Sequence, residues 1–401
     1  MQKTVPVADE IEASGKPPRQ GKHIILGIDG TWQAAFRDIF QSNVYRLNLA
    51  LNFEDETPER KPQIFIYSAG VGTANRSSQT IAGATGEGLA AIVLEAYINL
   101  VANYVPGDKI YIFGFSRGAF AARALSGMIS YSGLLKADSS SLIEHAWRFF
   151  TGEEKINYAA VKADNTHPGI EIEFLGVWDT VSGPFKREQL LEKYRFRNLQ
   201  LDRKVKCGVH ILSIDDSRRD YTPIPWEGCS HSGQIMEQIW MPGVHADIGG
   251  GYPEAFLSTT SLLLMIDKLA QYCPELSFDR NYIQNTLLDT VETLDVVVND
   301  ERTGFWRFFG RTVARNITDH VLNRHVEHPL VNLLRKRKIK FKGTQRAYSP
   351  SFSLPKTTGQ LAPADFHPNS WYLQKLKSIL EGKFPSAPRA EVKDAPGGQS
   401  D

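Results

Sequence analysis

Residues 107–120 read GDKIYIFGFSRGAF, and this stretch decides the fold class of the chain. A turn at its start precedes Lys109–Phe115, whose apolar side chains alternate onto both faces, as in a central strand of a parallel sheet. A helix rich in small residues follows over residues 118–130. Between them, Gly114-Phe-Ser116-Arg-Gly118 matches the Gly-x-Ser-x-Gly nucleophile elbow, in which a serine occupies a sharp turn from strand to helix.

Strand-like and helix-like stretches alternate on either side of this elbow. Residues 87–104 carry apolar side chains at helical spacing. Further strands are expected at His23–Asp29, Gln63–Ala69, Ile170–Trp178 and Gln238–Val244. Such alternation predicts an α/β fold of the α/β-hydrolase kind, with a mostly parallel sheet and helices on both faces. The chemistry of such sheets collects at the carboxyl ends of the strands.

Composition limits the classes of protein that the chain fits. Its 401 residues are 42% hydrophobic and 23% charged, enough for a sizeable core, and a net charge of +1 gives no basic field aimed at nucleic acid. Three cysteines without metal-type spacing fit synthesis in the reducing cytoplasm. We find neither a secretory signal nor an apolar run of transmembrane length, so export is expected only by a signal-independent secretion system.

Composition also divides the chain. Residues 1–20 and 385–401 are rich in small, polar and Pro or Gly residues and are predicted to be disordered. Residues 21–300 are expected to form the catalytic domain, and residues 301–384 a basic, helical region that packs on it or extends it. Residues 302–343 hold eleven Lys or Arg and two acidic residues, a local charge of +9.

The basic region contains an amphipathic pattern with two interpretations. Phe305, Phe309, Val313, Ile317 and Val321 recur every four residues. Because amphipathic helices usually belong to cores, the first interpretation is a helix packed on the domain with its charges in solvent. The second is a helix on an anionic membrane surface. Its membrane contacts would then be Phe305, Trp306, Arg307, Phe308, Arg311 and Arg315.

A serine at such an elbow points to acyl transfer. A hydroxyl is a weak nucleophile until a histidine takes its proton and a carboxylate orients that histidine. Ser116 is our candidate nucleophile, and the alternative is an ordinary turn in which this serine caps the helix. The backbone N–H of Arg117, at the helix start, is a candidate oxyanion donor.

His245 is the candidate base among ten histidines. It follows a strand-like run and precedes Gly249–Gly251, where the backbone can turn tightly. The alternative is a histidine that caps this loop. The rival His210 lies in a helix-like stretch, Lys204–Ile214, and is expected to be structural. Four others, His231, His320, His325 and His328, lie in weakly patterned or basic surroundings, and His367 lies near the end of the sequence.

Asp179 is the candidate orienting acid. It ends the strand that follows the nucleophile strand, and the chain order Ser116, Asp179, His245 is the order that this fold uses. The alternative for Asp179 is a helix or turn cap, a frequent role of aspartate. Asp247 is the second choice, because it lies close to His245 in sequence.

Residues Asp29-Gly30-Thr31 end the first strand. Their loop has two interpretations that we keep open. Backbone N–H groups near Gly30 and Thr31 supply a second oxyanion donor, or Asp29 holds the loop as a structural turn.

Five motifs occur in order over residues 22–260: Asp29-Gly30-Thr31-Trp32, Gly70-Val71-Gly72-Thr73, the run from Gly107 to Phe120, Val177-Trp178-Asp179-Thr180, and the run from Gly243 to Tyr252. They resemble the domain-of-unknown-function 2235 family, the α/β-hydrolase catalytic domain of type VI secretion phospholipase effectors (Tle1-like). Carried over motif by motif, the resemblance implies a triad of Ser116, Asp179 and His245. It also implies acyl-ester substrates, with phospholipids as the best-known class, and a secretion-system or immunity partner.

Two departures limit this resemblance. The chain is short beside effectors that carry extra membrane-docking or delivery modules, and many members of the family have no assigned activity. Residues beyond about 260 match less clearly. The leading hypothesis is a lipid acyl hydrolase that needs no metal or other cofactor. The alternatives are a soluble carboxylesterase or thioesterase, an inactive hydrolase-fold binding protein, and a metal-dependent phosphoesterase with Asp29, Asp179, His245 and Asp247 as ligands.

Overall fold

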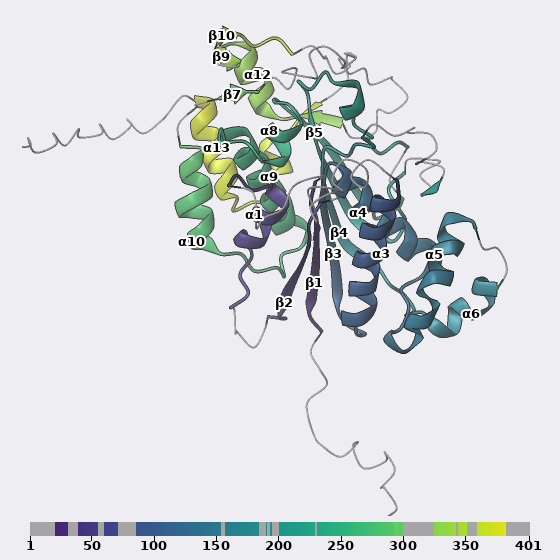
Figure 1. Cartoon of the computed structure of the whole chain (residues 1–401). Coiled ribbons are helices and arrows are strands. Elements are labelled where there is room, and N and C mark those ends of the chain that lie inside the picture. Colours follow the sequence, from purple (N-terminus) through teal and green to yellow (C-terminus); the bar gives the residue numbers. More distant parts are fainter. Residues whose placement is uncertain are drawn as a thin grey trace, which may run out of the picture.

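A parallel sheet runs through the middle of the computed structural model (Figure 1). Within the residues that the structure describes, eight strands form this sheet in the order β11-β8-β6-β5-β4-β3-β1-β2, and every neighbouring pair is parallel. The described residues are 21–30, 39–54, 60–70, 86–153, 157–183, 190, 193–194, 200–228, 231–292, 294, 296–299, 325–341, 344–350 and 359–381. The strands are β1 (His23–Ile28), β2 (Gln63–Ser68), β3 (Lys109–Phe115), β4 (Ile172–Trp178), β5 (Val205–Ser213), β6 (Ile235–Met241), β8 (His325–Glu327) and β11 (Gly359–Gln360).

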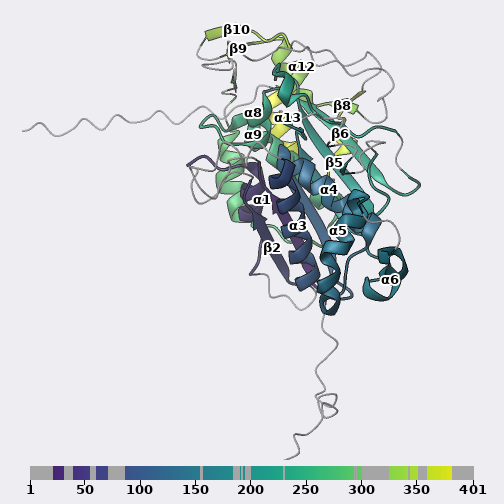
Figure 2. The same ribbon diagram turned by 45° about the vertical axis from the view of Figure 1, so that its right-hand side comes forward.

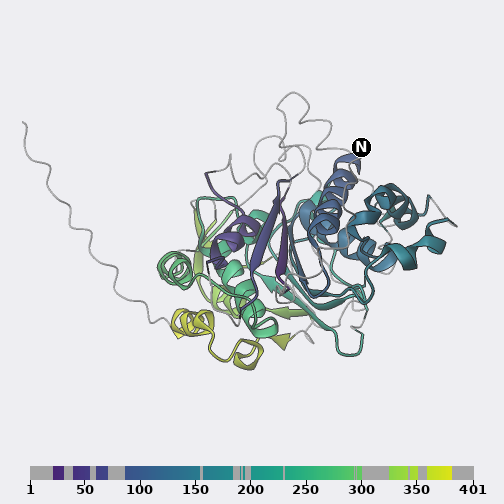
Figure 3. The same cartoon turned by 90° about the horizontal axis from the view of Figure 1, so that it is seen from below.

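Helices cover both faces of the sheet, so the central strands are apolar on both sides. In β3, Tyr111 and Phe113 join one core cluster, whereas Ile110 and Ile112 join the other. The view along the sheet shows the three layers (Figure 3).

The helices divide between the two faces as the core clusters do. The first face carries α1 (Asn43–Ala50), α9 (Phe256–Tyr272), α10 (Arg280–Tyr282) with the π-helical turn Ile283–Leu288, α12 (Pro329–Arg335) and α13 (Trp371–Glu381). The second face carries α3 (Gly86–Asn103), α4 (Arg117–Ser132), α5 (Ile143–Thr151) and α6 (Asn157–Asn165). Short helical turns lie at Ala137–Leu142, Arg219–Tyr221 and Pro363–Asp365.

The C-terminal part of the described chain adds strands to this framework. β8 pairs with β6, and β11 pairs with β8, so residues beyond 300 extend the main sheet at one edge (Figure 2). A second, small sheet contains β7 (Val297–Val298), β9 (Lys338–Phe341) and β10 (Thr344–Ala347). No described helix is both long enough and apolar enough to cross a bilayer.

The parallel arrangement places the candidate residues at one edge of the sheet. Ser116 directly follows β3, and Asp179 directly follows β4, its neighbour in the sheet. His245 is the first residue of the short helix α8 (His245–Gly249), four residues after the end of β6. In the sheet, β5 lies between β4 and β6, and it ends at Ser213.

Two sequence expectations need correction. Residues 204–214 do not form a helix, because they contain β5, which is buried on both faces between β4 and β6. A short continuous apolar run does not distinguish a buried strand from a buried helix, and here the β-branched residues and the sheet contacts decide. The expected strand Gln238–Val244 is β6, which begins earlier, at Ile235, and ends at Met241.

Candidate active site

Ser116 occupies the turn between β3 and α4 in an uncommon backbone conformation. Its φ is 61° and its ψ is −124°, outside the regions that residues with a side chain normally adopt. The turn is tight, because a Cβ at Gly114 would lie 2.4 Å from the Gly118 carbonyl oxygen. A Cβ at Gly118 would lie 2.3 Å from the Asp29 carbonyl oxygen. Both glycines of the motif are therefore required for α4 to approach the sheet so closely.

Asp179 and His245 are joined by a short hydrogen bond at the end of the sheet. The Oδ2 atom of the fully buried Asp179 lies 2.7 Å from Nδ1 of His245. Ser213 donates its backbone N–H to Asp179 Oδ1 at 2.9 Å and its hydroxyl to Oδ2 at 2.8 Å. An ionised carboxylate only accepts hydrogen bonds, so Nδ1 carries the ring proton and Nε2 is left with a lone pair.

The second ring nitrogen of His245 is not engaged. Nε2 is buried and has no hydrogen-bond partner, so it makes no hydrogen bond with the Ser116 hydroxyl in this structure. The imidazole packs against Phe115, the residue before the serine, with ring centroids 4.7 Å apart. Hydrogen bonds between a nucleophile and its base are often completed only when substrate binds.

Backbone strain is concentrated at the same edge. Among the described residues, Ser116 and Asp179 are the two residues other than glycine with positive φ, at 61° and 40°. Such conformations cost on the order of 1–3 kcal/mol each and cluster at functional sites. The two strained residues are linked, because Ser116 donates its N–H to the carbonyl oxygen of Trp178, 3.0 Å away and immediately before Asp179.

The loop after β1 approaches the serine, but one of its N–H groups is already used. A Cβ at Gly30 would lie 3.3 Å from the Ser116 Cβ, so this loop borders the serine. However, the Gly30 N–H donates to Asp29 Oδ1 at 2.7 Å. Asp29 Oδ2 also accepts hydroxyl hydrogen bonds from Ser42 at 2.6 Å and Tyr67 at 2.7 Å. This geometry favours the structural turn over Gly30 as an oxyanion donor, and the other candidate, Thr31, lies outside the described residues.

Arg117 contributes its backbone and its side chain to the same edge. It is the first residue of α4, and the first N–H groups of a helix lack acceptors within the helix. Its side chain is buried and lies against Gly183, where a Cβ would be 3.2 Å from Arg117 Cδ. Burial lowers the pKa of Arg117 to about 10, partly offset by Tyr221. The guanidinium therefore stays charged at neutral pH.

The rival histidine has a structural position. His210 lies in the middle of β5, fully buried, and its Nε2 accepts the Thr180 N–H at 3.1 Å. Burial lowers the pKa of His210 well below its usual range, so the ring stays neutral. It supports the backbone next to Asp179.

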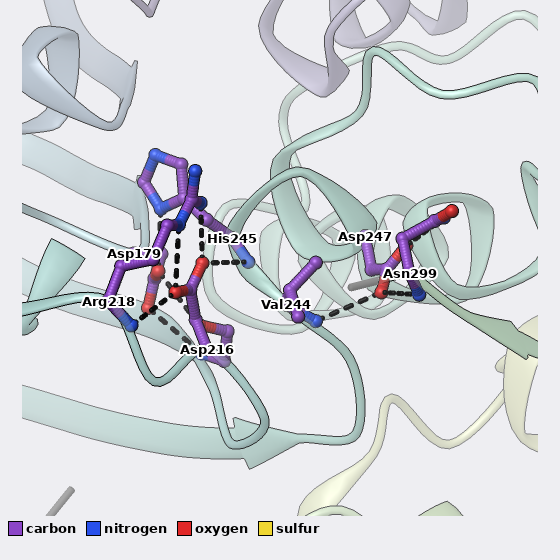
Figure 4. A network of polar contacts seen from close by, with 8 residues as sticks. Asp179, Asp216, Arg218, Val244, His245, Asp247 and Asn299 are labelled. Atoms are coloured by element: carbon purple, nitrogen blue, oxygen red, sulfur yellow. Dashed lines mark hydrogen bonds and ion pairs between the residues drawn. The ribbon is translucent and has the colours of Figure 1, made fainter. Parts of the chain in front are cut away.

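Asp247 does not join Asp179 around the imidazole. Its Oδ2 accepts the Val244 N–H at 2.9 Å and the Asn299 N–H at 3.1 Å, and its Oδ1 accepts the Asn299 amide at 2.8 Å (Figure 4). Burial raises the pKa of this carboxyl to about 7. Asp247 thus fixes the start of α8 and ties it to β7. The described residues contain no group of three or more His, Cys, Asp or Glu side chains arranged to hold a metal ion.

Four residues at this edge were missed from the sequence: Ser213, Asp216, Arg218 and Tyr221. The misassigned β5 concealed them, because Ser213 was expected within a helix and the other three after it, and not at the carboxyl end of a central strand. The signal was an apolar run followed by the polar residues Asp215–Asp220. The proposed membrane contacts, Phe305, Trp306, Arg307, Phe308, Arg311 and Arg315, lie outside the described residues.

A strained serine after β3, with a carboxylate after the adjacent strand β4 and a histidine after β6 hydrogen-bonded to it, is the arrangement of the α/β-hydrolase class. The family model described as "T6SS, phospholipase effector Tle1-like, catalytic domain" matches residues 22–268. The chain therefore belongs to this family.

The relatives extend beyond the length of this chain. An uncharacterized protein of Saccharomyces cerevisiae is 29% identical over an alignment of 237 residues, which covers 51% of this chain and 33% of the yeast protein. The crystal structure of an uncharacterized protein from Pseudomonas aeruginosa is 18% identical, with a TM-score of 0.43, over 65% of this chain and 47% of that one. A Tle1 effector bound to the VgrG spike of the type 6 secretion system is 19% identical, with a TM-score of 0.37, over 64% and 56%.

Proposed function

We propose that this protein is a serine hydrolase that cleaves acyl esters of lipids, with phospholipids as the substrate class. The observation that carries the proposal is the 2.7 Å contact between Asp179 and His245 Nδ1, which leaves Nε2 as a base beside the elbow that bears Ser116. The family description supports the choice of substrate, since it names phospholipase effectors.

In the proposed mechanism, Ser116 attacks the ester carbonyl carbon while His245 Nε2 takes its proton. Asp179 keeps the imidazole in the productive tautomer and stabilises the imidazolium that forms. The protonated His245 then gives its proton to the leaving alcohol, which leaves an acyl group on Ser116. Water, activated by His245, attacks this acyl-enzyme and releases the fatty acid. No step uses a metal ion.

The oxyanion of each tetrahedral intermediate is proposed to bind at the start of α4. The Arg117 N–H is the first donor, because the helix start concentrates partial positive charge where the oxyanion forms. We propose the Thr31 N–H as the second donor, because the Gly30 N–H already donates to Asp29 Oδ1. The buried guanidinium of Arg117 adds positive charge near the same position.

The family description also bears on delivery. Its members are described as type VI secretion effectors, and we therefore propose a signal-independent secretion route for this protein. Peripheral contact of the basic region with anionic lipid stays a prediction from sequence.

The test is to incubate wild type and Ser116→Ala with a panel of phospholipids and neutral acyl esters and to identify the products by mass spectrometry. Alanine has the same steric demand at positive φ as serine, so the fold should persist, which thermal melting checks. We expect hydrolysis to fall at least about 10³-fold, because the covalent intermediate is lost. A fluorophosphonate probe should label Ser116 in the wild type only.

Each other outcome selects a different function. Full activity of Ser116→Ala would contradict the mechanism. Hydrolysis restricted to short soluble esters would indicate a carboxylesterase or thioesterase. A wild-type protein that the probe does not label, and that hydrolyses no ester, would be a binding protein on a hydrolase fold. Activity abolished by chelators would favour the metal-dependent alternative.

A further inference from the structure

A second carboxylate contacts the histidine from the backbone side. Asp216, in the loop after β5, is buried, and its Oδ2 accepts the backbone N–H of His245 at 3.2 Å. The same oxygen lies 2.6 Å from the Arg218 Nη2 atom. Figure 4 shows Asp216 between the Arg218 guanidinium and the start of α8, close to Asp179.

The guanidinium of Arg218 is held by three contacts with two residues, Asp216 and Tyr221. Its Nε donates to Asp216 Oδ1 at 3.1 Å, so the ion pair has two contacts. Its central carbon lies 3.4 Å from the centre of the Tyr221 ring. The Tyr221 ring in turn meets the His245 imidazole edge-on, with centroids 4.9 Å apart. A chain of contacts therefore runs from the His245 backbone through Asp216, Arg218 and Tyr221 back to the His245 ring.

The charged and titratable groups at this edge of the sheet come from several elements around His245. Asp179 comes from the end of β4, and Arg117 from the start of α4, next to Tyr221. From the loop after β5 come Asp216, Arg218 and Tyr221. Asp215, in the same loop, is turned to the Gly243 N–H and the Tyr348 hydroxyl, and Asp247, on the histidine's own helix, is turned to Val244 and Asn299.

We propose that Asp216 and Arg218 are positioning residues that act as a charge-compensated pair. Asp216 fixes the backbone of His245, and Arg218 cancels the effect of that carboxylate on the protonation of the imidazole. The proposal rests on the proposed function, in which His245 must be neutral to accept the proton of Ser116.

The physical reason is the number of carboxylates near one ring. Asp179 is required to orient the imidazole, whereas a second uncompensated carboxylate would favour the protonated ring, which is no base. Interactions between buried charges a few ångströms apart are large, so Asp216 alone would shift the working range of the base. A guanidinium bound through two contacts and stacked on Tyr221 offsets this charge and also keeps Asp216 in place.

The two ends of the pair give opposite predictions. Arg218→Gln removes the positive charge bound to Asp216, and the acidic limb of the pH profile of kcat/KM should move up by about half a unit to one unit. Asp216→Asn removes the negative charge at the His245 backbone, and the limb should move down by a similar amount. The double variant Asp216→Asn/Arg218→Gln should return the limb close to its wild-type position. Arg218→Lys should keep the limb near its wild-type position but lower kcat. Lysine keeps the positive charge but cannot make both guanidinium contacts with Asp216.

The matched control is an ion pair at the opposite end of the sheet, Lys206 and Glu173, with Nζ and Oε1 2.8 Å apart. Lys206→Gln and Glu173→Gln make the same changes in net charge and should leave the limb within about 0.2 unit, since exposed charges so distant are screened. Shifts of the same sign in Asp216→Asn and Arg218→Gln, or no shift in folded variants, would overturn the proposal.

A second measurement separates this proposal from the proposed function. NMR of protein with ¹³C-labelled histidine follows the His245 ring directly, with His245→Gln to assign its signal. Its titration midpoint should move in the same opposite directions in Asp216→Asn and Arg218→Gln. If the titration midpoint shifts in these opposite directions while no ester is hydrolysed, the role of the Asp216–Arg218 pair is supported and the proposed reaction is wrong. An unmoved ring signal in an active enzyme would instead reject the pair alone.

Discussion

The two ends of the parallel sheet each hold a buried histidine in a polar network, but the networks differ. At the carboxyl end, His245 Nδ1 contacts the Asp179 carboxylate directly, at 2.7 Å. At the amino end, His23 Nδ1 lies 3.0 Å from the Tyr111 hydroxyl, which donates to Glu275 at 2.9 Å. A hydroxyl thus separates the histidine from its carboxylate at the amino end.

The difference teaches what distinguishes a reaction centre from a structural polar cluster. Glu275 is also paired with Lys109 at 2.6 Å, so its charge is largely compensated, and burial lowers the pKa of His23 to about 4. The histidine at that end is therefore neutral at physiological pH. No described residue other than glycine has a positive φ there, whereas both Ser116 and Asp179 do at the carboxyl end. A histidine near an acid is common, and the strained serine with the direct carboxylate contact is the informative feature.

The largest expected effect tests the direct carboxylate. In Asp179→Asn, the side-chain amide donates toward the imidazole and favours the tautomer with the proton on Nε2, which is no longer a base. We expect kcat to fall on the order of 10³- to 10⁴-fold with the fold intact. Ester hydrolysis by wild type and variant measures this, and Glu275→Gln is the matched control, with kcat within about twofold. Equal losses in both variants would remove the distinction between the two ends.

A smaller effect is expected from the residue that holds this carboxylate. Ser213→Ala removes the 2.8 Å hydroxyl contact with Asp179 but keeps the backbone N–H contact. One hydrogen bond to a charged group corresponds to about 1.5 kcal/mol, so kcat should fall about tenfold. Ser132→Ala is the control, because this buried serine ends α4, at the opposite end of that helix from Ser116, and its hydroxyl donates to the Ala146 carbonyl oxygen in α5. If Ser213→Ala has full activity while Asp179→Asn does not, the backbone contact alone orients the acid.

Sequence patterns predicted those parts of the molecule whose causes are local. The strand Lys109–Phe115 was predicted to its last residue, because the glycines of the elbow impose a sharp steric boundary on it. The positions of Ser116 and Asp179 at strand ends followed from the same alternation of strands and helices. The catalytic roles of these residues and of His245 stay predictions until the variants are measured.

The parts that sequence reasoning did not reach depend on contacts between distant segments. β5 is a short, largely apolar run, and its β-branched residues together with its pairing to β4 and β6 distinguish it from a helix. The hydrogen bonds of Ser213 to Asp179 join residues 34 positions apart, and no local pattern announces them. The role of the Gly30 N–H stayed open between oxyanion donor and structural turn, because the sequence does not show the side-chain direction of Asp29. Short strands such as β8 and β11 are defined by their pairing alone.

The smallest effect on catalysis is expected at the amino end, from His23→Phe. Phenylalanine keeps the edge contact with Tyr111, and kcat at pH 7–8 should stay within about twofold.

The same variant should instead change how the stability of the protein depends on pH. The pKa of His23 is about 4 in the folded protein, below its usual 6.5, so the unfolded chain binds more protons between these values. The wild type therefore loses up to about 3 kcal/mol of unfolding free energy at this residue as pH falls from 6.5 to 4, and the variant should not. Urea denaturation of both proteins at pH 7, 5.5 and 4.5 gives the difference between their unfolding free energies at each pH. Contributions of the other buried histidines are common to both proteins and cancel in this difference. An equal acid-side loss in the variant would show that His23 is protonated in the fold, and a large loss of kcat would make the amino end part of the catalytic machinery.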